Sequence, residues 1–112
     1  SPYEWSHHVK IGFDFGVSED DIKKLIAESV GEDTDLSLID KSVLRAAREM
    51  TLDGKLNDGT YAALADHFSN EHLVDLLVTI SFYNAVVRFL AAAEVDVEES
   101  YQAYLDQFPL SV

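Results

Sequence analysis

The chain has 112 residues, 47% of them hydrophobic, and its 21 acidic against eight basic side chains give a formal charge of −13. An electrostatic field of this sign repels nucleic acids and anionic membrane surfaces, so we expect neither as a partner. The chain contains no cysteine, which removes disulfide and thiol chemistry and suits a cytoplasmic protein, and no secretory signal is visible.

Helical patterns fill the chain, and no segment has the alternation of a strand. The first helix is expected over residues 2–15, ending at Gly16. Ser18 and Ser37, each followed three residues later by an aspartate, open helices that run to about residues 29 and 52. Three further helices are expected over residues 58–67, capped by Asp58, over 70–94, capped by Ser69 or Asn70, and over 97–107. The fold class is therefore all-α, a compact bundle of about six helices in a single domain, residues 1–112.

The segment Tyr3-Glu4-Trp5-Ser6-His7-His8 carries the main candidate for chemistry. At about 100° per residue, Glu4 and His8 lie one turn apart on a stripe that continues through Ile11 and Phe15. We expect this stripe to face inward and His7 to face solvent. A carboxylate beside an imidazole, held away from water, can act as a general acid–base pair. The same i, i+4 pair can instead satisfy each other or a neighbouring backbone group, without any catalytic role.

The pattern Tyr-Glu-Trp-x-x-His-x-x-x-Gly-x-x-x-Gly at residues 3–16 resembles the carboxymuconolactone decarboxylase family of the alkylhydroperoxidase D-like superfamily. Residues 44–50, 58–64 and 82–90 match further blocks in the family's order, so the resemblance reaches to about residue 95. The resemblance implies an all-α fold, a trimeric or hexameric ring, and Glu4 and His8 at the active-site positions.

Two departures from the family pattern matter. The redox branch of the superfamily carries Cys-x-x-Cys-x-x-x-His, and, counted back from His8, its cysteine positions fall on Ser1 and Glu4. Thiol peroxidase chemistry therefore lacks its nucleophile, and the resemblance is to a cysteine-free branch of the superfamily. Family members also have a further helical region before this segment, so N-terminal helices are expected to be missing.

Residues 76–93 are apolar on nearly every side of the expected helix 70–94. Such a pattern predicts a helix enclosed by others, at the centre of the fold or at a subunit interface. Its length approaches a membrane span, but Asn84 and Arg88 interrupt it and acidic residues flank both ends. We therefore expect no membrane contact but a homo-oligomer, a trimer or a hexamer, with this helix or the first one at an interface.

Ser81, Asn84 and Arg88 share one face of this helix. A buried guanidinium must be paired. Arg88 would either grip a substrate carboxylate in a bidentate fork, or be tied to Glu49, Glu4 or a neighbouring subunit. The spacing is compatible with both the substrate-binding and the structural role of Arg88.

The resemblance and the shared helix face predict a cofactor-free lyase that acts on a small lactone or carboxylated ring compound. Loss of carbon dioxide leaves carbanion or enolate character that needs a proton and charge stabilisation. His8 would donate that proton, with Glu4 orienting it or tuning its pKa, while Arg88 would hold a carboxylate and Tyr83 or Asn84 would contribute hydrogen bonds.

Two alternatives stay open: a non-catalytic oligomeric small-molecule-binding protein of the same fold, and a peroxidase-related protein that lacks the redox cysteines. His67 and His72 are assigned to surface or capping roles, because their spacing does not resemble a zinc site. The His7-His8 dipeptide is not a convincing metal site either, since neighbouring side chains on a helix point in different directions. No metal and no cofactor are expected.

Overall fold

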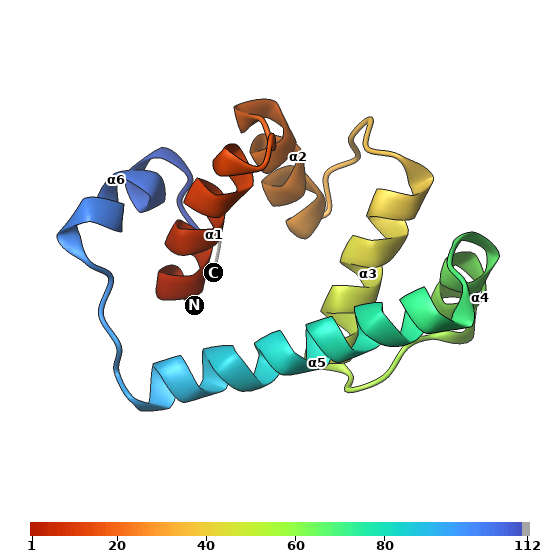
Figure 1. Ribbon diagram of the computed structural model, residues 1–112. Coiled ribbons are helices and arrows are strands. Elements are labelled where there is room, and N and C mark those ends of the chain that lie inside the picture. The colour runs from red at the N-terminus through yellow and green to blue at the C-terminus, as the bar shows by residue number, and fades with distance from the viewer. Residues whose placement is uncertain (111–112) are drawn as a thin grey trace. The chain divides into compact units, whose positions relative to one another are not determined.

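The computed structural model describes residues 1–110, and within them it contains six helices and no strand (Figure 1). The all-α prediction is therefore confirmed. The helices are α1 (Pro2–Asp14), α2 (Glu19–Ser29), α3 (Leu38–Leu52), α4 (Asp58–His67), α5 (Asn70–Ala92) and α6 (Glu99–Gln107). The expected helix 70–94 ends early because Glu94 adopts a left-handed conformation with φ of 51°, which terminates a helix.

Serine caps begin α2 and α3, as the sequence predicts. Ser18 Oγ accepts a hydrogen bond from Asp21 N at 3.1 Å, and Asp21 Oδ2 accepts one from Ser18 N at 2.8 Å, which completes a capping box. These bonds from the backbone and hydroxyl of Ser18 hold the pKa of Asp21 below its ordinary value. Ser37 Oγ accepts from Asp40 N at 3.1 Å in the same way. Both caps are local, which is why three-residue spacing was enough to find them.

The beginning of α4 differs from the prediction, because its cap residue is Asn57 rather than Asp58, and no side-chain bond caps it. The carboxylate of Glu49 in α3 takes this place. It accepts hydrogen bonds from Asn57 N at 2.9 Å, Asn57 Nδ2 at 3.0 Å and Thr60 Oγ1 at 2.8 Å. The backbone bond from Asn57 is the main reason that the pKa of Glu49 is lowered. Glu49 thus connects α3 to the first turn of α4.

The described chain divides into two compact units, each with its own core. Unit 1 comprises residues 1–34 and the chain from Val87 onward, and unit 2 comprises Asp35–Val86. In unit 1 the buried core is Val9, Ile22 and Phe108, with Trp5, Phe13, Val17, Ile26 and Tyr104 packed against it. In unit 2 it is Ala46, Leu64 and Leu73, with Ile39, Val43, Leu56, Phe68, Leu76, Leu77 and Ile80 around them. A single domain over residues 1–112 stays a prediction.

The long helix α5 packs on the core of unit 2 through Leu73, Leu76 and Leu77, but much of its apolar surface is exposed, so the expectation that other helices or a second subunit enclose it stays a prediction. Leu73 is the one buried residue of α5. Val74, Val78, Phe82 and Phe89 are 57–70% exposed. By length and composition α5 could cross a membrane, which is weak evidence because the core helices of soluble proteins meet the same criteria. An apolar pattern shows that a helix needs cover, but not which molecule supplies it.

Candidate functional site

Helix α1 carries the candidate site, and its rotation is fixed by small and apolar side chains. Ser1 Oγ accepts a hydrogen bond from Glu4 N at 3.2 Å, and Pro2 occupies the first turn, where it costs no backbone bond. Ser6 and Val9 are the buried residues of the helix, and the Ser6 hydroxyl donates to Tyr3 O at 3.0 Å. Trp5 Nε1 donates to Phe108 O at 2.7 Å. The inward face of α1 is therefore the one that carries Ser6 and Val9.

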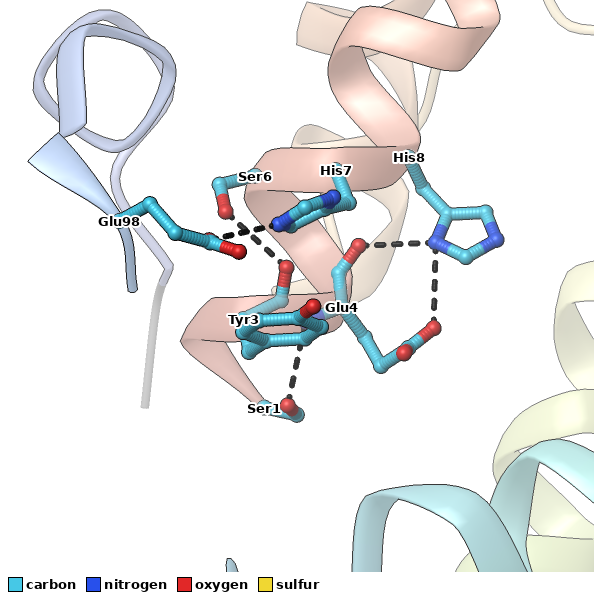
Figure 2. A network of polar contacts seen from close by, with 7 residues as sticks. All are labelled: Ser1, Tyr3, Glu4, Ser6, His7, His8 and Glu98. Carbon is cyan, nitrogen blue, oxygen red and sulfur yellow. Dashed lines mark hydrogen bonds and ion pairs between the residues drawn. The ribbon is translucent and has the colours of Figure 1, made fainter. Parts of the chain in front are cut away.

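Glu4 and His8 contact each other on α1, as predicted (Figure 2). The Nδ1 atom of His8 lies 2.8 Å from the main-chain oxygen of Glu4 and 3.2 Å from its Oε2 atom. The side chain of His8 is 43% exposed and that of Glu4 is 18% exposed. The prediction that His8 is largely buried is therefore wrong: the imidazole lies at the surface, and only its carboxylate partner is mostly covered.

His7 is the more buried histidine, which corrects the prediction that it faces solvent. Its ring is stacked between those of Tyr3 and Tyr101, with centroids 4.3 Å and 3.7 Å away, and its side chain is 20% exposed. Its Nε2 atom donates to Glu98 Oε2 at 2.9 Å. Figure 2 shows Tyr3, His7 and Glu98 on one side of α1 and His8 with the Glu4 carboxylate on the other. Two adjacent histidines thus have different environments.

Glu98 and Tyr3 have pKa values shifted in opposite directions, each mainly by one of its neighbours. The hydrogen bond from His7 is the main reason that the pKa of Glu98 is lowered, and a bond from the Tyr3 hydroxyl adds to it. The negative charge of Glu98 is in turn the main reason that the pKa of Tyr3 is raised. Glu98 is therefore an ionised acceptor, and Tyr3 a protonated donor, at neutral pH.

These lowered carboxyl pKa values predict acid sensitivity. Asp21, Glu49 and Glu98 all have folded-state pKa values below the ordinary 3.8 for aspartate and 4.5 for glutamate. The stabilisation they provide is fully present above those ordinary values and is lost as the pH falls through the lowered ones. We expect the free energy of unfolding to decline as the pH drops below about 4.5, measured by denaturant unfolding followed by circular dichroism.

The variant Glu98→Gln tests the share of this effect that belongs to the His7 contact. Its amide is neutral at every pH, so we expect lower stability at neutral pH and a weaker dependence on pH below about 4.5 than in the wild type. The neighbouring Glu99→Gln is the matched control and should follow the wild-type curve. An unchanged pH dependence in Glu98→Gln would contradict the assignment.

The predicted substrate-binding residues are distributed over α5. Tyr83 and Asn84 belong to unit 2, whereas Arg88 belongs to unit 1. Asn84 Nδ2 donates to Thr51 Oγ1 and Ile80 O, each at 3.1 Å, and the ring of Tyr83 lies edge-on to a neighbouring phenylalanine. Arg88 is exposed, so the argument that a buried guanidinium requires a partner does not apply to it. Of the predicted site, the structure brings together Glu4 and His8.

Sequence reasoning missed Glu98 and Tyr101. They reach His7 from a segment about ninety residues further along the chain, and no spacing within the first helix signals such a contact. His67 and His72 are exposed, as expected. Among residues 1–110, no group of three or more histidine, aspartate or glutamate side chains is placed to hold a metal ion.

No protein-family model, curated protein or solved structure matches this chain. The family resemblance read from residues 3–16 and the later blocks therefore stays a prediction.

Proposed function

We propose that the chain is a cofactor-free acid–base enzyme of the carboxymuconolactone decarboxylase type, which acts through His8 on a small lactone or carboxylated ring compound. The contacts of His8 Nδ1 with Glu4 support this most directly, because Glu4 O at 2.8 Å and Glu4 Oε2 at 3.2 Å are both hydrogen-bond acceptors. The Nδ1 atom must therefore carry hydrogen, which leaves the lone pair of the neutral ring on Nε2.

The position of this second nitrogen suits proton transfer. Figure 2 shows the Nε2 edge of His8 pointing away from Glu4, and the side chain is 43% exposed. A small molecule can therefore reach the imidazole, while a carboxylate behind the ring fixes its orientation. This is the arrangement in which a histidine acts as a general acid or base and a carboxylate positions it.

In the proposed reaction, the carbon–carbon bond to the substrate carboxylate breaks and its electron pair stays on the ring carbon as carbon dioxide leaves. The protonated His8 then donates its Nε2 hydrogen to that carbon and recovers a proton from water. The Glu4 carboxylate stabilises the imidazolium form of His8, which is the form that donates the proton and is restored afterwards. Arg88 is proposed to bind a substrate carboxylate, and Tyr83 and Asn84 stay candidates from the resemblance alone.

Incubation with small carboxylated lactones in deuterated water tests the reaction class. We expect release of carbon dioxide together with one deuterium on the carbon that lost it, detected by mass spectrometry. Release of carbon dioxide without His8-dependent deuterium incorporation would contradict the proposal.

A non-catalytic small-molecule-binding protein is the second candidate, favoured by an apolar pocket in unit 1. That function predicts ligand-dependent thermal stabilisation without turnover.

We also propose a homo-oligomer, a trimer or a hexamer, in which another copy covers part of α5. The exposed apolar side chains of α5 motivate this proposal, because monomeric soluble proteins rarely expose such a run. We expect the wild type to sediment as an oligomer at micromolar concentration and Phe82→Asp as a smaller species. Val30→Asp, which places the same charge at the exposed residue that follows α2, should sediment like the wild type. A monodisperse wild-type monomer would contradict the proposal.

A further inference from the structure

A pocket of about 190 Å³ lies within unit 1. Its lining comes from three places in the sequence: Trp5 of α1, Ile26 and Ser29 of α2, and Pro109 and Leu110 after α6. Four of these five side chains are apolar, so the pocket offers a ligand mainly dispersion contacts and removal from water.

The polar groups of the lining side chains are already engaged. The indole N–H of Trp5 donates to Phe108 O at 2.7 Å, and the hydroxyl of Ser29 donates to Leu25 O at 2.7 Å. Neither hydrogen is available to a ligand. A charged or strongly polar molecule would lose part of its hydration without receiving a hydrogen bond from these side chains, which costs free energy. The formal charge of −13 adds a further penalty for an anion.

The volume of the pocket matches a ligand of about one ring. An apolar protein cavity of about 150 Å³ holds a benzene molecule, and this pocket is slightly larger, at about 190 Å³. The indole of Trp5 adds an aromatic wall against which a second ring can pack. We propose that this pocket binds one uncharged monocyclic aromatic compound. The proposal stands apart from the acid–base function, since binding without turnover leaves it intact.

Trp5 gives the experiment its signal, because it is the only tryptophan of the chain. The purified full chain is titrated with toluene while the fluorescence of Trp5 is followed, and benzoate is titrated in parallel. We expect a saturable change with toluene and an affinity for benzoate at least about tenfold lower, equivalent to about 1.4 kcal/mol. A linear, non-saturating response to toluene would overturn the binding site. Equal affinities would overturn the choice of an uncharged ligand.

Two matched variants test whether toluene binds in this pocket. Ser29→Phe puts a ring into the pocket from an exposed position, so toluene affinity should fall at least about tenfold. Ser42→Phe on α3, in unit 2, is the control, since the Ser42 hydroxyl bonds Leu38 O just as Ser29 bonds Leu25 O. It should bind toluene like the wild type. Wild-type affinity in a folded Ser29→Phe would overturn the assignment.

If Ser29→Phe does not fold, which circular dichroism would reveal, a further variant tests whether toluene binds in this pocket. Leu110→Asp places a carboxylate on the pocket wall outside every helix, where it disturbs no backbone hydrogen bond of a helix. Toluene affinity should again fall at least about tenfold. An affinity equal to that of the wild type would place any toluene binding elsewhere.

Discussion

His8→Ala is expected to lower kcat by about 10²–10⁴-fold, the usual share of a general acid or base. The variant lacks the Nε2 hydrogen that the proposed reaction transfers. Its melting temperature should stay close to that of the wild type, because the side chain is 43% exposed and its contact with Glu4 lies within one helix turn. Steady-state kinetics and thermal unfolding, measured on the same preparation, separate the two effects.

The adjacent His7→Ala is the matched control, with the opposite pattern expected. It removes the stacked contacts with Tyr3 and Tyr101 and the hydrogen bond to Glu98. We expect a clearly lower melting temperature with kcat per folded molecule unchanged. A folded His8→Ala with near wild-type kcat would end the acid–base proposal and favour a binding protein.

Phe108→Ala is expected to lower the free energy of unfolding of unit 1 by about 3–5 kcal/mol, as for other buried phenylalanines. The side chain is 1% exposed, contacts the core residues Val9 and Ile22, and lies with its ring centroid 6.0 Å from that of Phe13. Domain stabilities are about 5–15 kcal/mol, so this loss is a large fraction of the total. Denaturant unfolding followed by the fluorescence of Trp5, which packs on this core, measures it.

Phe15→Ala makes the same chemical change at a side chain that is 85% exposed. Exposed substitutions away from special features usually change stability by less than about 0.5 kcal/mol, so the wild-type curve is expected. Equal losses in the two variants would contradict the core described for unit 1.

The helices were predictable because their signals are local. Ser18 with Asp21 and Ser37 with Asp40 lie within one turn, and the structure contains both caps. The apolar face of α3, with Ile39, Val43 and Ala46, also follows from its periodicity alone. The missed cap of α4 depends on Glu49, eight residues before Asn57, which is beyond what a local pattern contains.

The orientation of the histidines was not predictable in this way. Apolar periodicity grouped Glu4 and His8 with Ile11 and Phe15, yet Ile11 and Phe15 are both exposed. The buried positions are Ser6 and Val9, and a small polar residue such as serine carries little weight in a hydrophobic pattern. Serine fits inside because its hydroxyl bonds the backbone of the preceding turn. The carboxylate–imidazole contact itself was predictable, since i, i+4 spacing fixes it.

The bond from Trp5 Nε1 to Phe108 O joins positions 103 residues apart, and this separation affects how the protein is made. Unit 2 is one continuous stretch, Asp35–Val86, whereas unit 1 combines both sides of that stretch. During synthesis, α1 emerges early but lacks the aromatic ring that completes its core until Phe108 follows. The newly made chain therefore exposes Val9 and Ile22 while unit 2 is being synthesised, and the interior of unit 2 can form before unit 1 is complete. Ribosome-bound chains that stop before α6 should accordingly protect unit 2, and not α1, from proteolysis.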